Sequence, residues 1–273
     1  MPTTSNKTPI PLKIAIDAGH GPNTPGKRCP DDSMREFQFN SAVAELMREE
    51  LRLYSTASGA EVVVRFTHAE DGARDVPLSE RTAAANVWPA DVFVSIHANA
   101  FGETWNEANG IETYTAKICS PVSARLAHTV QRKLTQATGL RDRGVKQADF
   151  TVVARTKMPA VLIEAGFMTH PREAELLKSG AYRKTVALTI VEALAEVFGL
   201  KRLPAIAPEG DNDALPNELA AVNVSVNGKA LSSGYLIGGV SYVPARETAE
   251  ALGVKVSWDS ASQTVNIYKR SCS

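Results

Sequence analysis

Residue types that could bind a metal and move a proton stand next to three apolar segments of this chain. His20 comes after the apolar run at 12–16, in the sequence DAGHG; His97 directly follows the run at 91–96, and Glu164 ends the run at 160–164. Imidazole nitrogens and carboxylate oxygens are ligands of Zn²⁺ in hydrolytic sites, where three protein ligands leave a fourth position for water. Water held there ionises near neutral pH, and a further carboxylate can take and return its proton. The residues therefore predict a metal-dependent hydrolytic site, although a structural role for each single histidine stays open.

The second carboxylate that such a site needs is not decided by spacing. Glu36, just ahead of the first amphipathic stretch, is one candidate, and Asp31, Asp32 and Glu45 are rivals. The two histidines are not three or four residues apart, as in the HExxH motif, so no single helix brings the ligands together. The other histidines are interpreted as structural or exposed: His68, His128 and His170.

Strands that must position these groups are predicted at six largely apolar, β-branched segments: 12–16, 61–66, 91–96, 111–115, 150–153 and 160–164. Apolar residues recur at helical spacing at 43–54, 122–134 and 186–198, and a shorter helix is predicted at 79–85. Strands that alternate with helices predict an α/β domain with a mostly parallel central sheet of about six strands flanked by helices. Ligands of such sheets bind at the carboxyl ends of the strands, where His20, His97 and Glu164 are expected.

A different pattern begins after residue 202. The segment 203–216 is rich in proline and acidic residues and has no apolar period, so it predicts a linker between a catalytic domain at 1–202 and a small module at 217–273. The module is predicted to be α+β, with strands at 222–226, 235–243, 254–258 and 264–268, a helix at 245–252 and a tight turn at Asn227-Gly228.

The composition narrows the possible partners. Among 273 residues, 30 basic side chains balance 30 acidic ones, whereas a nucleic-acid-binding protein normally carries a basic excess. No apolar run reaches the ~20 residues that a membrane helix needs, and the polar segment 1–11 has no hydrophobic signal-peptide core. We therefore expect synthesis in the cytosol, no membrane insertion and no nucleic-acid partner. The three cysteines are far apart in the sequence and indicate neither a disulfide scaffold nor a thiolate zinc cluster. They are Cys29, Cys119 and Cys272.

Six motifs stand in order between about residues 12 and 198: IDAGHG, REFQFN, LSERTAAAN, VSIHANA, GIETY and PAVLIEAGF. In this order they resemble the zinc-dependent N-acetylmuramoyl-L-alanine amidase family (the amidase_3 type of autolysins and phage endolysins). By that resemblance His20, Glu36 and His97 hold zinc and Glu164 is the catalytic carboxylate. Weaker candidates for contacts to the substrate or to these groups are Asn99, Arg81 and Asn40. The resemblance implies peptidoglycan as the substrate and hydrolysis of the amide bond between N-acetylmuramic acid and L-alanine.

The small module carries a second resemblance. VNGKAL, GGVSYVPARETAEALG and VSWDSASQTVNI are similar to the N-terminal domain of copper amine oxidases. Residues 203–273 hold no histidine and only one cysteine, so we do not expect copper there. We expect the module to bind the cell wall, because a tethered second site lengthens residence on a polymer. A role as a spacer or in dimerisation is the alternative.

The missing signal-peptide core favours a phage endolysin, which lyses a Gram-positive host after release through a membrane lesion. A bacterial autolysin that acts after mother-cell lysis would have the same activity. A zinc peptidase that cuts within the stem peptide would use the same residues. A non-catalytic wall-binding protein is the alternative from a different class, and the presence of all four proposed site residues speaks against it.

Overall fold

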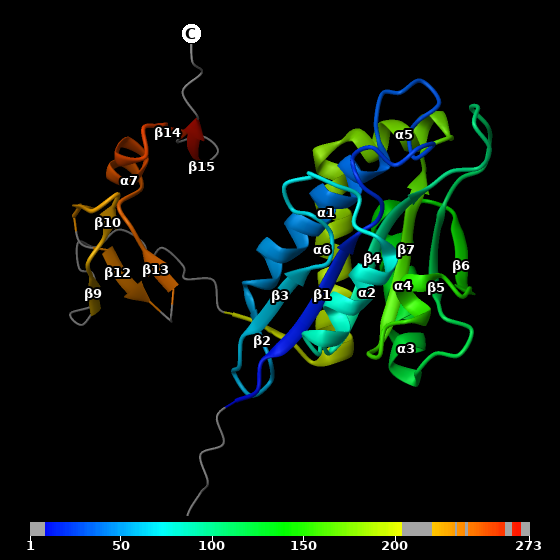
Figure 1. The fold of residues 1–273 in the computed structure, drawn as a ribbon, viewed down its shortest axis with the longest axis horizontal. Helices are drawn as coiled ribbons and strands as arrows, with labels where there is room; N and C mark the ends of the chain where they lie inside the picture. Colours follow the sequence, from blue (N-terminus) through cyan, green and yellow to red (C-terminus); the bar gives the residue numbers. More distant parts are fainter. Residues whose placement is uncertain (1–8, 204–219, 233, 238–239, 260–263, 269–273) are drawn as a thin grey trace, which may run out of the picture. The chain divides into compact units, whose positions relative to one another are not determined.

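The computed structural model describes residues 9–203, 220–232, 234–237, 240–259 and 264–268 (Figure 1). The chain divides into two compact units, Met1–Ala205 and Ile206–Ser273. The predicted linker at 203–216 lies outside the described residues apart from Leu203. The limits 1–202 and 217–273 that the sequence indicates for the two domains therefore stay a prediction. Among the described residues, no helix combines the length and the apolar character needed to cross a membrane.

A six-stranded sheet forms the centre of the first unit, in the order β3-β1-β4-β7-β5-β6. Its strands are, in chain order, β1 (Leu12–Ala18), β3 (Val62–Phe66), β4 (Val92–Asn99), β5 (Ile111–Thr115), β6 (Asp142–Gln147) and β7 (Ala160–Phe167). Neighbouring strands are parallel except β5 and β7, which are antiparallel. The prediction of a mostly parallel sheet is confirmed.

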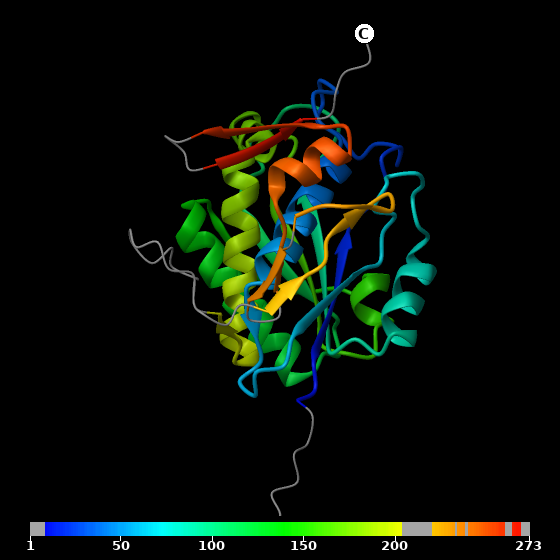
Figure 2. The ribbon, with the colours of Figure 1, turned by 90° about the vertical axis from the view of Figure 1, so that its left-hand side faces the viewer.

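Helices cover both faces of this sheet, as Figures 1 and 2 show. The three long helices pack together on one face: α1 (Glu36–Leu51), α3 (Pro121–Thr138) and α6 (Gly180–Phe198). The two helices on the other face are α2 (Leu78–Val87) and α4 (Thr151–Ala154), and the short α5 (Pro171–Lys178) precedes α6. The predicted apolar stripes face the core: Val43, Met47 and Leu51 of α1 are fully buried, and each such side chain stabilises the fold by about 1.5–3 kcal/mol.

A short strand pair connects the end of this unit to the turn after α1. β2 (Tyr54–Ser55) pairs antiparallel with β8 (Lys201–Arg202). Leu203 N donates to Leu53 O, and Arg202 forms an ion pair with Glu50 at 2.6 Å. Leu203, the first residue of the predicted linker, is therefore bonded to the first unit.

Within the six-stranded sheet, one predicted strand is wrong, and one strand was not predicted. Residues 151–153 lie in the single turn of helix α4 and Phe150 is its N-cap, because so short an apolar run fits a buried helical turn as well as a strand. Val152 and Val153 are buried in the smaller apolar cluster. The strand missed by the sequence is β6, which reads DRGVKQ and lies at the sheet edge with β5 as its partner. An edge strand needs no continuous apolar run, so the sequence holds little signal for it.

In the residues that the structure describes, the second unit contains short antiparallel strand pairs and one helix. Its elements are β9 (Ala220–Val222), β10 (Ser225–Val226), β11 (Lys229–Ala230), β12 (Gly234–Ile237), β13 (Val240–Tyr242), α7 (Ala245–Ala251), β14 (Lys255–Asp259) and β15 (Thr264–Tyr268). Asn227 and Gly228 have φ values of 50° and 78°, as the predicted tight turn requires. The prediction of one strand at 235–243 is wrong: β12 and β13 are separate and antiparallel, and the sequence between them contains Gly-Gly, a turn signal that outweighs the apolar run.

Candidate metal centre

The metal-ligand atoms proposed from the sequence converge at one edge of the sheet. His20 follows β1, His97 lies near the carboxyl end of β4, and Glu36 is the first residue of α1. His20 Nε2 is 3.2 Å from Glu36 Oε2, and His97 Nδ1 is 2.9 Å from Glu36 Oε1. One ligand atom from each of the three residues lies within 4.8 Å of the other two. Ligand atoms this close together are compatible with the binding of one ion by all three residues.

Glu36 is the acidic candidate that the fold brings to the histidines. Asp31 and Asp32 lie in an exposed loop, and Glu45 forms an ion pair with Arg48 at 2.5 Å. Glu36 is 2% exposed and stands in the first turn of α1. The partial positive charge of a helix N-terminus favours a carboxylate there.

The two histidines determine the ionisation of Glu36. Burial by itself would raise the pKa of Glu36, but the hydrogen bonds and charges of His20 and His97 outweigh it and hold this pKa well below its usual range. Burial likewise opposes charge on His97, but Glu36 raises the pKa of this imidazole overall. The site therefore keeps an anionic carboxylate between two imidazoles, which suits a cation.

Glu164 lies beside the proposed metal ligands. It is the register partner of His97 across β7 and β4. Its Oε2 atom is buried and accepts no hydrogen bond from the described part of the chain. Burial raises the pKa of Glu164 to about 8; the charge of His97 opposes this rise and the Glu36 carboxylate adds to it. A free carboxylate oxygen at this position can exchange a proton with a group bound next to it.

Gly19 and Asn40 hold the ligands at this spacing. A Cβ atom added to Gly19 would lie 2.1 Å from His97 Cε1, so only glycine lets the turn after β1 approach the imidazole. Asn40, one turn after Glu36 on α1, donates through Nδ2 to Gly19 O at 3.0 Å and to Glu36 Oε1 at 3.3 Å. Asn40 is fully buried, so the structure places this candidate against the ligands.

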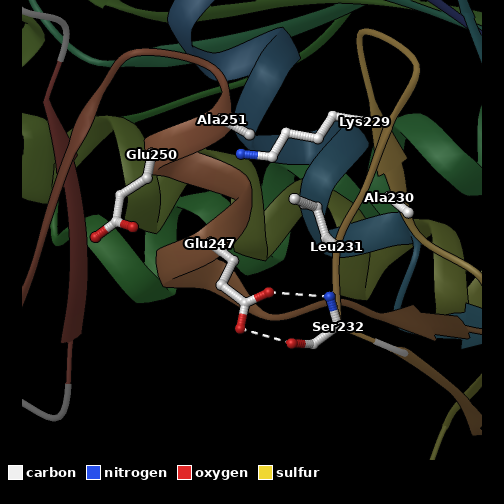
Figure 3. A pocket seen from close by; sticks show the side chains of 7 residues that line it. All are labelled: Lys229, Ala230, Leu231, Ser232, Glu247, Glu250 and Ala251. Atoms are coloured by element: carbon white, nitrogen blue, oxygen red, sulfur yellow. Dashed lines mark hydrogen bonds between the residues drawn. The ribbon is translucent and has the colours of Figure 1, made fainter.

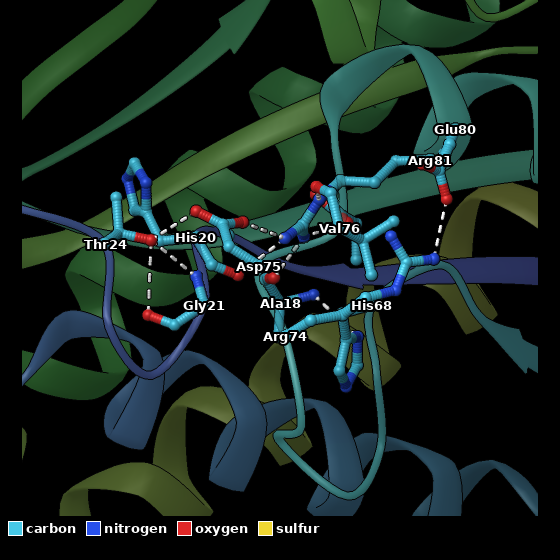
Figure 4. Close-up of polar contacts among 12 residues, drawn as sticks. Ala18, His20, Gly21, Thr24, His68, Arg74, Asp75, Val76, Glu80 and Arg81 are labelled. Atoms are coloured by element: carbon cyan, nitrogen blue, oxygen red, sulfur yellow. Dashed lines mark hydrogen bonds and ion pairs between the residues drawn. The ribbon is translucent and has the colours of Figure 1, made fainter.

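Arg81 is buried behind the turn that carries His20 (Figure 4). It donates through Nη2 to His20 O at 2.6 Å and through Nη1 to Ala18 O at 2.6 Å and Asp17 Oδ1 at 2.7 Å. His20 has a φ of 63°, which is uncommon and costly for a residue other than glycine, and the bond to its carbonyl supports it. Burial opposes ionisation of Asp17, but the charge of Arg81 holds the pKa of Asp17 below its usual range. Arg81 thus positions His20 from inside the protein.

Replacing Arg81 by methionine should destabilise the protein by about 3–5 kcal/mol, because the Asp17 carboxylate is left buried without its partner. Urea unfolding of the metal-free protein measures this change. Arg132→Met is the matched control: its ion pair with Glu196 is half exposed, and such pairs contribute about 0–1 kcal/mol. Equal losses in the two variants would contradict the positioning role of Arg81.

The predictions for His68 and His170 as structural residues agree with their contacts. His68 Nδ1 accepts a hydrogen bond from Ala18 N at 3.1 Å, and its ring packs on Phe66. His170 accepts from Glu173 N at the start of α5. Burial lowers the pKa of His68 to about 4. Charges of both signs surround its ring: Asp17, Glu70, Arg48 and Arg81.

The free energy of unfolding of the metal-free protein should fall as the pH drops from about 6.5, the pKa of an exposed histidine, towards about 4, the pKa of His68 in the folded protein. Below pH 6.5 the unfolded chain binds a proton at His68 that the folded protein excludes until the pH is about 4. His68→Asn keeps an acceptor for Ala18 N and removes the titration. Urea unfolding at pH 7 and pH 4 should then show a pH-dependent loss smaller by roughly 3 kcal/mol than in wild type. Equal losses in both proteins would contradict this role.

Asn99 lies next to a carboxylate that the sequence analysis did not single out. Asn99 Nδ2 donates to Glu112 Oε1 at 2.8 Å. Glu112 also accepts from Tyr114 Oη at 2.8 Å, from Arg143 Nε at 2.6 Å and from Lys146 Nζ. Glu112 was present in the motif GIETY, but its partners on β6 are more than thirty residues away, so no local pattern marks it.

Two imidazoles and a carboxylate, with a separate free carboxylate beside them, are the residue set of a metal-dependent hydrolase. The chain belongs to the N-acetylmuramoyl-L-alanine amidase family, whose model matches residues 14–196. The model of the copper amine oxidase N-terminal domain matches residues 225–272. Both resemblances expected from the motifs are confirmed.

Individual relatives agree with this membership. The chain is 34% identical to N-acetylmuramoyl-L-alanine amidase CwlM of Bacillus licheniformis over 70% of each chain. It is 32% identical to the endolysin of Bacillus phage SPP1 over 69% of this chain and 67% of that one. The solved catalytic domain of the amidase CwlV of Bacillus (Paenibacillus) polymyxa var. colistinus superposes with a TM-score of 0.62 at 32% identity, covering 70% of this chain and 99% of that one.

Proposed function

We propose that this protein is a zinc-dependent peptidoglycan hydrolase that cleaves the amide bond between the lactyl carbonyl of N-acetylmuramic acid and the amino group of L-alanine. The observation that carries the proposal is the free Oε2 atom of Glu164 beside the converging ligands His20, Glu36 and His97. Membership of the amidase family supports the choice of bond.

The residues fit zinc by their donor chemistry. Two imidazoles with one glutamate form a known ligand set of catalytic zinc, which leaves one position open for water or substrate. The low pKa of Glu36 provides the negative charge that a cation requires. When bound, zinc would polarise the scissile carbonyl and lower the pKa of water.

Glu164 carries the proton transfers. Its Oε2 atom accepts a proton from the attacking water as the water oxygen bonds to the lactyl carbonyl carbon. Glu164 then donates that proton to the nitrogen of L-alanine as the C–N bond breaks. Its buried position favours holding the proton between these two events.

Mass spectrometry of digested peptidoglycan, with added zinc and with a chelator, tests the proposed function. We expect free stem peptides that begin with L-alanine, released only in the presence of zinc. New ends within the stem peptide would instead indicate a zinc peptidase. If nothing is released from several wall types, the chain is a binding protein.

The biological role stays a prediction. A phage endolysin that lyses a Gram-positive host and a bacterial autolysin require the same bond to be cut, and a bacterial amidase and a phage endolysin match this chain at similar identity.

We propose the second unit as a cell-wall-binding module. Tyr235 and Tyr242 are register partners on β12 and β13, and both are exposed, so two neighbouring aromatic rings stand on one face of this small sheet. Glu247 of α7 accepts hydrogen bonds from Ser232 N at 2.9 Å and Ser232 Oγ at 2.7 Å, which attaches the helix to the strands (Figure 3). The side chains of Trp258 and Tyr268 lie outside the described residues.

A chain that ends after Leu203 should stay folded and bind zinc but lyse whole cells more slowly. This end point keeps β8 and its pairing with β2. A tether to a second site can raise apparent affinity by about 10²–10⁴-fold, so wall binding in a pull-down should fall strongly while cleavage of a short soluble substrate is retained. Unaltered wall binding would contradict the targeting role.

A further inference from the structure

The proposed catalytic glutamate belongs to a row of polar residues that crosses the sheet. His97 on β4, Glu164 on β7 and Glu112 on β5 are register partners in turn. Register partners on neighbouring strands share a face of the sheet, and the strands are about 4.8 Å apart. Arg143 and Lys146 on β6 extend this row, because both donate to Glu112. From the proposed metal ligands to the two cations, the strands of the sheet therefore follow in the order β1, β4, β7, β5, β6.

At the far end of the row, two cations share one carboxylate. The side chain of Glu112 is 3% exposed and pairs with both Arg143 and Lys146. These two cations are partly open to solvent, with exposed fractions of 26% and 37%. Burying a carboxylate is costly unless it is paired, but one cation would suffice for that purpose. The second cation is available for another anion.

Packing holds these cations in place. The Arg143 guanidinium lies 4.8 Å from the centre of the Phe167 ring, and Lys146 Nζ lies 5.8 Å from the centre of the Tyr114 ring. Arg143 Nη1 also donates to Asn109 O at 3.3 Å. An anion that binds there would meet groups with little freedom left to lose, which favours binding.

The chemistry of the reaction orients the substrate along this row. The scissile carbonyl must face the ligand side, at His20, Glu36 and His97, while the nitrogen of the leaving peptide must face Glu164, which protonates it. The peptide beyond this nitrogen then continues away from the ligands, towards β5 and β6. From Glu164 on β7 to the cations on β6 the peptide crosses one to two strand spacings, about 5–10 Å. This distance corresponds to one or two peptide residues.

We propose that Arg143 and Lys146, anchored on Glu112, form a subsite for a carboxylate that the stem peptide carries on the residue after L-alanine. This inference rests on the proposed function, because Glu164 as proton donor to the leaving amine sets the direction of the peptide. A carboxylate in this subsite receives charge-assisted hydrogen bonds, which a carboxamide at the same atom cannot replace.

Two soluble substrates that differ only at this group test the subsite: N-acetylmuramoyl-L-alanyl-D-glutamate and its α-carboxamide, the D-isoglutamine compound, both with the γ-carboxyl group blocked as a methylamide. The ratio of their kcat/KM values is the readout. We expect wild type to prefer the carboxylate about tenfold or more, and Lys146→Gln to reduce the ratio towards 1. Lys146→Arg should restore the preference, and the preference should decrease with added salt because the cations are partly exposed.

Lys133→Gln is the matched control, because this lysine on α3 is also partly exposed and paired, with Glu196 at 3.3 Å. It should keep the wild-type ratio. If Lys146→Gln slows both substrates by the same factor, the cluster has only a structural role and the subsite is contradicted. If wild type cleaves peptidoglycan but shows no preference between the two compounds, the subsite fails and the proposed function stands. If wild type cleaves neither these compounds nor peptidoglycan, both fail.

Discussion

Replacing Glu164 by glutamine should reduce amide hydrolysis by about 10³-fold, while zinc binding and folding are retained. A positioned general acid–base contributes about 10²–10⁴-fold to a rate, and Glu164 is proposed to act in both proton transfers. Glutamine has the same shape but cannot accept the proton. It also removes a buried ionisable group, so the thermal unfolding temperature should be unchanged or higher. Turnover of a soluble substrate and the zinc content of the purified protein measure the two effects separately.

The control for this substitution is Glu107→Gln, at an almost fully exposed carboxylate in the loop after β4. It should leave turnover as in wild type. If Glu164→Gln kept full activity, the proton transfers would have to be assigned to another group. If it lost zinc together with activity, Glu164 would belong to the ligands and our separation of the two roles would be wrong.

Replacing Glu36 by alanine should weaken zinc binding by more than about 100-fold and abolish hydrolysis. Loss of a residue that only supports a metal ligand already costs about 10–100-fold in affinity, and Glu36 is proposed to bind the ion directly. The substitution also removes the carboxylate that accepts from both imidazoles and from Ala98 N at 3.2 Å. Competition with a chromophoric chelator measures the affinity, and circular dichroism shows whether the variant is folded.

Asp32→Asn is the matched control for Glu36, because Asp32 is a rival candidate in the sequence and its side chain forms an exposed ion pair with Arg28. Asparagine tolerates the left-handed backbone found at this position, where φ is 60°. The control should bind zinc as tightly as wild type. A folded Glu36→Ala protein that retained zinc would contradict the ligand set proposed here.

The two substitutions together separate binding from chemistry. Glu164→Gln is expected to hold zinc without turnover, and Glu36→Ala is expected to lose both. A protein in which both variants lost zinc, or both kept it, would need a different division of roles.

Much of the fold follows from local pattern. The apolar runs that became β1, β4 and β7 are long and β-branched enough to be recognised as strands buried on both faces. The stripes that became α1, α3 and α6 repeat at helical spacing and do pack on the sheet. Where the pattern was short or absent, prediction was wrong: 150–153 is a helical turn, and the edge strand β6 has no apolar run.

The candidate site could be predicted only in part, because local pattern locates strands but not the contacts between distant segments. His20, His97 and Glu164 stand at the ends of recognisable strands, so their common edge follows from a parallel sheet. Glu36 does not follow in this way, because its position depends on how the loop after His20 returns the chain to α1. The family motif selected it, and the tertiary structure shows the contact that makes this choice physically reasonable.

The order of residues establishes which chemical groups this protein has and which strands carry them. The packing of the folded chain establishes which of these groups meet when they are far apart in the sequence. Arg81 reaches Asp17 and the carbonyl of His20 across more than sixty residues. Glu112 faces Glu164 because β5 runs antiparallel to β7, which brings the start of one strand to the end of the other. Local propensity contains no information on such pairings, because burial and long-range packing of the whole sheet determine the direction and register of each strand.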